Sequence, residues 1–317
     1  MTVIHPPRTG TGRAVGSCGE LLQGITEHDR HFLVTLPIRG GSIAVFEPGP
    51  EPVSVAPPHK SKALLLANAM VARSRVLRGG RLTLRSDLPE GKGLASSTAD
   101  LVATARAVAD AERRPLPVAE IEADLRVIEP SDGVMYPGTV AYCHREVRLL
   151  ARLGTLPALT IVTGDEGGLV DTVEFNRSEP CFSPGTKHEY SALLAELSTA
   201  VACGDLATVG AVSTRSATLC TRTRPHLEAT IAATRALGGL GVVVAHSGTT
   251  TGILLAEDDP HYRAKLAGAQ EICAEFACAT GIQHSWRPLS RPTSRPHPVD
   301  HTTQPAHPAV LPGSTPP

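Results

Sequence analysis

The segment LPEGKGLASSTAD, residues 88–100, constrains the fold more than any other part of the chain. It follows an alternating apolar and polar run at 80–87, typical of a half-buried strand, and leads into an alanine-rich run at 97–114 with strong helix propensity. A strand, a glycine-rich loop and a helix in this order direct backbone N–H groups and a helix N-terminus at one point. The segment therefore predicts an anion-binding loop, and the alternative is a helix that its serines merely cap.

This loop does not match three other motifs of similar composition. A Walker A loop needs a glycine five residues before its Gly-Lys pair, and here Gly91-Lys92 lacks that glycine and is followed by Gly93. The segment also lacks the Gly-x-Gly-x-x-Gly pattern with an acidic partner that marks a dinucleotide-binding turn, and no Gly-x-Ser-x-Gly occurs in the chain. These absences disfavour a P-loop, a dinucleotide-binding fold and an α/β-hydrolase.

Hydrophobic periodicity predicts strands and helices without a regular alternation. The strands are expected at 30–38, 41–47, 80–87, 157–165 and in a hairpin at 241–257. The helices are expected at 59–77, 97–114, 118–129, 188–203, 206–220, 225–237 and 262–280. Because this order differs from that of a doubly wound sheet, it favours an α+β fold in two halves.

The composition excludes several classes of function. Of the 317 residues 41% are apolar, enough for a sizeable core, while the net charge is −1 and only 3% are aromatic, so nothing supports nucleic-acid binding. The seven cysteines are scattered without a Cys-x-x-Cys pair, and no run approaches the ~20 apolar residues of a membrane span. We expect a soluble, cytoplasmic protein with reduced thiols, and neither nucleic acid nor membrane as a partner.

Shifts in composition divide the chain into three parts. We expect an N-terminal domain at 1–155, which contains the anion-binding loop, and a C-terminal domain at 156–285. The last part, 286–317, is rich in proline with serine, threonine and histidine between, and it shows no helical or strand periodicity. Because it offers too few apolar residues for a core, we expect this tail to be disordered.

Three motifs in order resemble those of the GHMP kinases, the superfamily of galactokinase, homoserine kinase and mevalonate kinase. GSCGELLQG at 16–24 resembles the first motif, and AHSGTTTGILL at 245–255 resembles the third, a glycine-rich turn between strands. The second is a phosphate-binding pattern of Pro, three residues and Gly-Leu-(Gly/Ala)-Ser-Ser-(Ala/Ser/Thr). Its matching residues are Pro89, Gly93, Leu94, Ala95, Ser96, Ser97 and Thr98.

Within that superfamily the sequence is most similar to the L-threonine kinases of propanediol utilisation and cobalamin salvage. It shares their GSCGEL-x-QG at 16–24, their Glu-Pro-(Ser/Thr)-Asp loop at 129–132 with a Pro-Gly at 137–138, and their D-x-GG-x-VDT-x-x-FNR at 165–177. The resemblance implies ATP and Mg²⁺ as cofactors and transfer of phosphate to the side-chain hydroxyl of L-threonine, for the aminopropanol linker of cobalamin. The alternatives are homoserine, serine or another hydroxy amino acid as substrate, or an inactive nucleotide- or metabolite-binding protein.

The resemblance also implies a two-domain fold, with an N-terminal half like ribosomal protein S5 domain 2 and a ferredoxin-like C-terminal half. A small hydroxy amino acid is the expected partner, and the protein could also form a homodimer. Asp132 would accept the proton of the substrate hydroxyl, Lys92 would add charge beside the phosphates, and Ser97 and Glu129 would bind Mg²⁺. Glu122 is the rival of Glu129, and Asp132 could instead only shape its loop. The residues that would cradle the nucleotide are Pro89, Gly91, Lys92, Gly93, Leu94, Ala95, Ser96, Ser97 and Thr98.

Residues from both ends of the chain are expected to contact the substrate. Most come from the first and third motifs, and two come from the 165–177 segment. Each also has a structural alternative, such as a buried Cys18, a buried and paired Glu20, or a tight turn at 247–249. The expected substrate-binding residues are Cys18, Gly19, Glu20, Asp171, Thr172, Ser247, Gly248 and Thr249.

Overall fold

The computed structural model describes residues 6–168, 182–220 and 224–288, and within them ten strands form one hydrogen-bonded sheet. The strands are β1 (Gly10–Ile25), β2 (His31–Gly49), β3 (Ser54–Ala56), β4 (Gly79–Ser86), β5 (Thr139–Cys143), β6 (Arg148–Gly154), β7 (Leu159–Asp165), β8 (Gly241–Val244), β9 (Thr250–Ala256) and β10 (Ala279–His284). The helices are α1 (Ser61–Arg73), α2 (Ser96–Ala111), α3 (Val118–Arg126), α5 (Pro184–Cys203), α6 (Leu206–Leu219), α7 (Leu227–Leu237) and α8 (Tyr262–Phe276).

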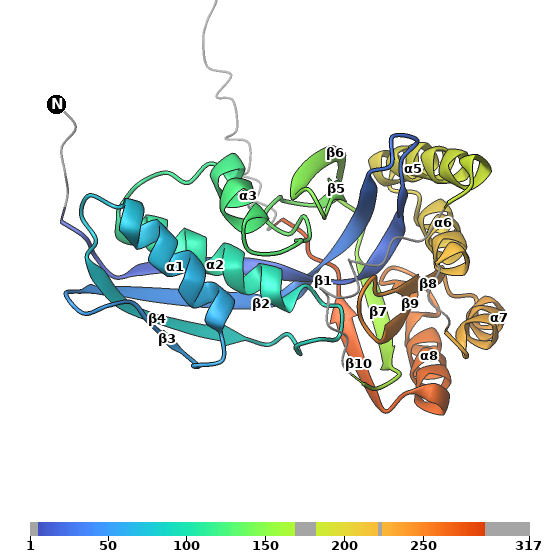
Figure 1. Cartoon of the computed structure of the whole chain (residues 1–317). Coiled ribbons are helices and arrows are strands. Elements are labelled where there is room, and N and C mark those ends of the chain that lie inside the picture. Colours follow the sequence, from blue (N-terminus) through green and yellow to red (C-terminus); the bar gives the residue numbers. More distant parts are fainter. Residues whose placement is uncertain (1–5, 169–181, 221–223, 289–317) are drawn as a thin grey trace, which may run out of the picture.

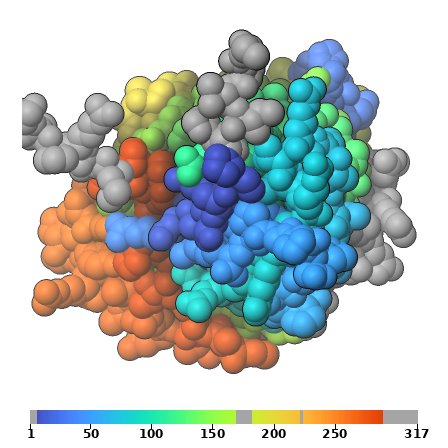
Figure 2. All heavy atoms as spheres, turned by 90° about the vertical axis from the view of Figure 1, so that its left-hand side faces the viewer, coloured from blue at the N-terminus to red at the C-terminus, as the bar shows by residue number. Residues whose placement is uncertain are grey.

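The strands run in the order β10-β7-β9-β8-β1-β2-β4-β3, and β5 and β6 extend from β2 outside this path. Figure 1 shows α1 and α2 lying over the β1, β2 and β4 region, while α5 to α8 gather at the end of the molecule that holds β7 to β9. On the surface in Figure 2, blue and cyan N-terminal residues lie next to orange C-terminal residues. Helices and strands follow one another without regular alternation and pack around one sheet, which confirms the predicted α+β fold.

Helix α2 is buried along nearly its whole length, against α1 and the β1–β2 part of the sheet. Small residues make this packing close: a Cβ at Gly12 of β1 would lie 2.0 Å from the carbonyl oxygen of Ala103, and one at Gly10 would lie 2.2 Å from that of Ala107. The close approach of the α2 backbone therefore requires glycine at positions 10 and 12 of β1. This contact holds the N-terminus of α2, and the loop before it, in a fixed place on the sheet.

Strand β1 is irregular where it carries the 16–24 motif. Its pairing with β2 shifts register on both sides of Glu20, and Gly19 has a φ of +67°. Bulges of this kind re-aim side chains and are frequent next to functional sites. Glu20 pairs with Thr35 of β2 and with Val244 of β8. The motif therefore lies where the first strands of the chain meet the last ones.

Most predicted elements are confirmed to within a few residues. The helix predicted at 262–280 is too long, because it ends at Phe276 and Ala279–His284 forms β10 instead. These six residues pair one by one with β7, and this tertiary pairing overrides a local preference for helix. Strands β3, β5 and β6 were not predicted from the sequence, since they are short and lack clear alternation. Strand β1 was not predicted either, because its residues were interpreted as a glycine-bounded motif. None of the helices in the described ranges is long and apolar enough to cross a membrane.

Candidate active site

A cleft of about 350 Å³ opens where the 88–100 segment meets β1, α1, the loop after α3 and the turn between β8 and β9. Eleven of the residues expected from the sequence to form the site line it: Glu20, Gly91, Gly93, Leu94, Ala95, Ser96, Ser97, Thr98, Glu129, Asp132 and Ser247. Elements far apart in sequence therefore bring one set of chemically suited side chains together.

The loop of the 88–100 segment has the backbone expected of an anion-binding turn. Gly91 and Gly93 have φ values of +71° and +81°, and Ala95, the N-cap residue of α2, is also left-handed with φ +55°. Within the described part of the chain no side chain caps α2, so its first N–H groups are not occupied by a serine hydroxyl. The loop thus points a helix N-terminus into the cleft, an arrangement that favours a phosphate.

Ser97 and Glu129 form a polar pair inside this cleft. The Ser97 hydroxyl donates a hydrogen bond to one carboxylate oxygen of Glu129, and Lys62 of α1 forms an ion pair with the other. Ser97 is therefore bonded to Glu129 and does not cap its helix. The rival Glu122 lies elsewhere: it accepts hydrogen bonds from the Tyr136 hydroxyl at 2.8 Å and the Leu149 N–H at 3.2 Å.

Asp132 lies on the loop after α3, beside the N-terminus of α2. Its backbone N–H donates to the Thr98 hydroxyl at 3.3 Å, which ties the loop to the first turn of the helix. Burial, and next the negative charge of Glu129, raise the pKa of Asp132 to about 6. A carboxylate with such a pKa is ionised at neutral pH and is still basic enough to accept a proton.

Glu20 lies on the bulge of β1 and is 3% exposed. Burial, and next the charge of Asp132, raise the pKa of Glu20 well above its usual range, against a smaller lowering by the Thr35 hydroxyl. Within the described residues its Oε2 atom has no hydrogen-bond partner. Since a buried carboxylate without a partner is costly, this oxygen is available to a cationic or hydrogen-bonding ligand in the cleft.

Lys92 lies on the side of the loop that faces the C-terminal strands. Its Nζ atom forms an ion pair with Asp165 at 2.7 Å and donates to the Gly168 carbonyl at 2.7 Å. The Lys92 carbonyl accepts a hydrogen bond from the Thr250 hydroxyl at 2.8 Å. Lys92 does not line the cleft, so these contacts connect the loop to β7 and β9.

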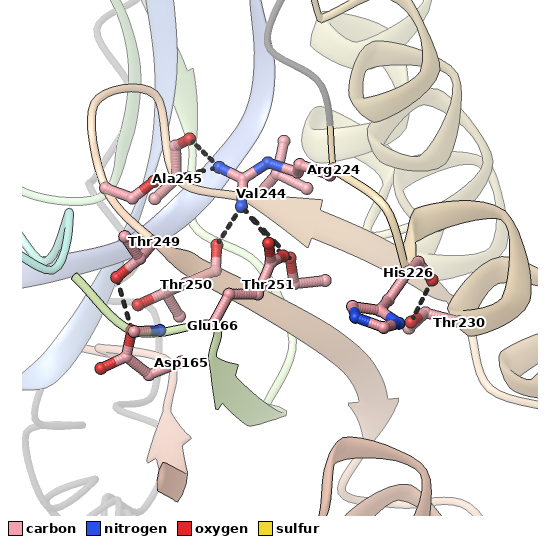
Figure 3. A network of polar contacts seen from close by, with 12 residues as sticks. Asp165, Glu166, Arg224, His226, Thr230, Val244, Ala245, Thr249, Thr250 and Thr251 are labelled. Atoms are coloured by element: carbon pink, nitrogen blue, oxygen red, sulfur yellow. Dashed lines mark hydrogen bonds and ion pairs between the residues drawn. The ribbon is translucent and has the colours of Figure 1, made fainter. Parts of the chain in front are cut away.

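The turn between β8 and β9 packs directly on the loop. A Cβ at Gly248 would lie 2.2 Å from the Lys92 carbonyl oxygen, so this position requires glycine. Thr249 donates its hydroxyl hydrogen to Asp165, as Figure 3 shows. Ser247 lines the cleft, whereas Gly248 and Thr249 support it from behind.

Several residues that line the cleft were not assigned to the site from the sequence. Lys60 pairs with Asp100 at 2.6 Å and with Glu90 at 2.5 Å; burial by itself would lower its pKa, but these two partners raise it overall. Three of the chain's five lysines, Lys60, Lys62 and Lys92, lie between positions 60 and 92, and this clustering is the signal that could have drawn attention to them.

Two histidines also line the cleft. The rings of His144 and His246 contact edge to face, with centroids 4.7 Å apart. His246 also bonds through Nδ1 to the Gln23 side chain at 2.9 Å, and burial, followed by the charges of Arg145 and His31, lowers its pKa to about 3. A neutral His246 therefore shapes the cleft without adding charge. Neither histidine was assigned to the site from the sequence.

The remaining candidates lie outside the cleft or outside the described residues. Cys18 is fully buried, and burial followed by the charge of Glu20 raises the pKa of its thiol to about 12. Gly19 and Pro89 do not line the cleft either. Asp171 and Thr172 lie outside the described residues.

The donor set suits a magnesium ion that is carried by a nucleotide. Among the described residues, no three His, Cys, Asp or Glu side chains are grouped so that they could hold a metal ion by themselves. Mg²⁺ usually binds one or two protein ligands and takes its other ligands from phosphates and water. Ser97 and Glu129, already in contact at the N-terminus of α2, would supply two such oxygens.

Comparisons with known proteins agree with this geometry. Residues 61–136 match the model of the GHMP kinases N terminal domain. An L-threonine kinase of Salmonella typhimurium is 25% identical over 268 residues, which cover 80% of this chain and 84% of the relative. An L-threonine kinase of Citrobacter freundii is 25% identical over 249 residues, which cover 75% and 84%.

Solved structures show the same fold. Mevalonate kinase of L. major in complex with R-mevalonate has a TM-score of 0.66 at 17% identity, over 90% of this chain and 98% of that one. Homoserine kinase of Cytophaga hutchinsonii has a TM-score of 0.65 at 14% identity, over 90% and 96%. The matched N-terminal domain, the two relatives and the shared fold show that this chain is similar to the GHMP kinases over most of its length.

Proposed function

We propose that this protein transfers the γ-phosphoryl group of ATP to the side-chain hydroxyl of L-threonine, with O-phospho-L-threonine and ADP as products. The GHMP kinase family and the L-threonine kinase relatives support a phosphotransferase that acts on an alcohol group. The observation that carries the proposal is the meeting of Ser97, Glu129 and Asp132 in the cleft that the phosphate-binding loop forms.

The loop and the N-terminus of α2 would bind the nucleotide phosphates. The left-handed backbone at Gly91, Gly93 and Ala95 opens the loop, and the uncapped helix end offers N–H groups and a positive dipole. Ser97 and Glu129 would hold Mg²⁺, which when bound neutralises charge on the phosphate oxygens. Lys62 would stay close to this negative charge, since it is already paired with Glu129 at the mouth of the cleft.

Asp132 would orient and deprotonate the attacking hydroxyl. As the oxygen of the acceptor bonds to the γ-phosphorus, the bond from that phosphorus to the bridging β–γ oxygen breaks, ADP leaves, and the hydroxyl proton passes to the Asp132 carboxylate. The pKa of about 6 fits this role, because the group is ionised before transfer and accepts a proton more readily than an ordinary aspartate.

Glu20 supports an amino acid as the acceptor. Its buried Oε2, which lacks a partner within the described residues, lines the same cleft as Asp132. An ammonium group placed there would pair with Glu20 and offset the repulsion between the two carboxylates, which is the second cause of its raised pKa. Threonine carries its ammonium group on the carbon next to the one that bears the hydroxyl, so it could supply this partner. A hydroxy acid without an amine would leave Glu20 unpaired.

The test is ADP release by the purified protein with ATP and Mg²⁺ and a panel of threonine, homoserine, serine and the deaminated analogue of threonine. We expect threonine to give the highest kcat/KM and the analogue without an amine to give at least a tenfold lower value. The Glu20→Gln variant should raise the KM for threonine and leave the KM for ATP nearly unchanged. A higher kcat/KM for homoserine or serine would show that the substrate is that amino acid and not threonine. ATP binding without turnover on any hydroxyl compound would contradict the proposed kinase activity.

A further inference from the structure

Arg224, which lies shortly before α7, has a side chain that is only 1% exposed. Arginine is rarely buried to this degree unless its donors are paired. One nitrogen, Nη2, donates to the carbonyl oxygens of Ala245 at 2.7 Å and Gly248 at 3.2 Å. A single guanidinium nitrogen thus connects the two ends of a tight turn, and Figure 3 shows the Arg224 side chain beside Ala245, Thr250 and Thr251.

The other nitrogen, Nη1, extends the same network into β9 and the end of β7. It donates to the Thr250 carbonyl at 3.4 Å and the Thr251 hydroxyl at 3.3 Å, and it lies 3.5 Å from a carboxylate oxygen of Glu166. Thr251 in turn donates to that same oxygen at 3.0 Å. The buried positive charge of Arg224 is therefore balanced by Glu166 and shared among backbone carbonyls.

The two residues between the bonded carbonyls, His246 and Ser247, line the cleft. Gly248, whose carbonyl Arg224 holds, is also the residue that packs on the Lys92–Gly93 backbone of the phosphate-binding loop. Arg224 itself does not line the cleft. A buried side chain behind the turn is thus in contact with the backbone that fixes both walls of the cleft.

We infer that Arg224 is a positioning residue, which holds the β8–β9 turn so that the phosphate-binding loop and the wall formed by His246 and Ser247 keep one spacing. This inference rests on the proposed function for its kinetic consequence, but its structural part stands on the described contacts. Lysine is a poor substitute, because its single nitrogen cannot bond the Ala245 and Gly248 carbonyls and also reach the partners of Nη1 on β9 and at Glu166. Displacements of about 1 Å in such walls cost up to about 100-fold in rate.

The structural part is tested by hydrogen–deuterium exchange in the full chain. We compare Arg224→Gln and Arg224→Lys with Arg215→Gln, a matched control on α6 whose side chain is 50% exposed and paired with Glu189. The Ala245 N–H bonds to the Thr250 carbonyl at 3.0 Å and reports on the turn. Exchange over 241–251 should rise at least tenfold in Arg224→Gln, rise less in Arg224→Lys and stay unchanged in Arg215→Gln.

The kinetic part uses the same variants. Arg224→Gln should lower kcat at least tenfold while the KM for each substrate changes less than about threefold, since the contacts to bound substrates remain but their spacing is lost. Arg224→Lys should recover part of kcat. The inference would be overturned if Arg224→Gln kept both its exchange and its kcat within twofold of wild type. If Arg224→Gln does not fold, the same criterion applies to Arg224→Lys. If the wild-type protein phosphorylates no acceptor, the proposed function fails, and the exchange result alone decides the role of Arg224.

Discussion

The hydroxyl of Ser97, at the N-terminus of α2, donates a hydrogen bond to the carboxylate of Glu129, which follows α3 in the chain. These two residues are 32 positions apart in the sequence, and their contact forms a polar pair beside the phosphate-binding loop. Lys62 forms an ion pair with the second carboxylate oxygen, so a lysine balances the negative charge of Glu129. Of the two glutamates that the sequence left open as Mg²⁺ ligands, only Glu129 contacts Ser97, which is why we propose Glu129.

If Glu129 binds Mg²⁺, the Glu129→Gln variant should lose at least about 100-fold in kcat and require more Mg²⁺ for half-maximal activity. Mg²⁺ should also strengthen the binding of a fluorescent ATP analogue much less than in the wild type. Glu122→Gln is the control: it should keep the response to Mg²⁺ and lose about 1–3 kcal/mol of stability, because Glu122 accepts two partly buried hydrogen bonds. Equal Mg²⁺ responses in Glu129→Gln and the wild type would exclude Glu129 as a ligand.

Replacing Asp132 by asparagine should lower kcat by about 10²- to 10⁴-fold, because the amide cannot accept the hydroxyl proton. In the wild type, kcat/KM should fall as the pH drops through about 6, where the Asp132 carboxylate becomes protonated. The measurement is a pH–rate profile of both proteins between pH 5 and 8. A residual rate in Asp132→Asn that is as high as that of the wild type would remove Asp132 from the proton transfer.

Asp132→Asn should also stabilise the fold at alkaline pH. Because the folded-state pKa of Asp132 is raised to about 6, its contribution to stability is fully present below its ordinary pKa and is lost as the pH rises through 6. At pH 8 the ionised group therefore costs about 3 kcal/mol, which the amide avoids. Urea unfolding should show this gain at pH 8 and a smaller one at pH 4. A loss of stability at pH 8 would contradict this sign.

Two glycines with the same backbone angle test whether the loop must touch the β8–β9 turn. Gly93 and Gly168 both have φ +81°, but a Cβ at Gly93 would lie 2.4 Å from the Ala245 Cβ and 3.0 Å from the Gly248 Cα, whereas at Gly168 no atom of the described residues lies within 4 Å. Both alanine variants should lose about 1–2 kcal/mol to backbone strain. Gly93→Ala alone should raise the KM for ATP at least tenfold, and similar KM values in the two variants would show that the contact is dispensable.

The pair Lys92→Met and Asp165→Asn tests what Lys92 does. If Lys92 serves ATP as a positive charge, Lys92→Met should weaken ATP binding about tenfold, while Asp165→Asn, which releases Lys92 from its 2.7 Å ion pair, should preserve or strengthen it. If the ion pair only connects the loop to β7, both single variants and the double variant should weaken binding alike. Titration with a fluorescent ATP analogue, read as a double-mutant cycle, separates these outcomes.

The sequence by itself determined the parts of this protein that depend on neighbouring residues. Glycines at 91 and 93 and small residues at 95–98 specify a left-handed loop and a helix start, because each acts through its own backbone angles. The same holds for most helices, whose boundaries follow from periodicity and from breakers. The three motifs and their order along the chain are also read from the sequence alone, and they indicate the similarity to the GHMP kinases.

Only the tertiary structure decided which side chains meet. Glu122 and Glu129 are seven residues apart and would share one face of a continuous helix, but α3 ends at Arg126, so Glu129 turns toward Ser97 while Glu122 bonds to Tyr136. Arg224 belongs to no motif, and its role as a bridge between carbonyls exists only once the β8–β9 turn has folded around it. Residues distant in sequence are brought together by packing of the sheet and helices, and that packing is not encoded in any single stretch of the chain.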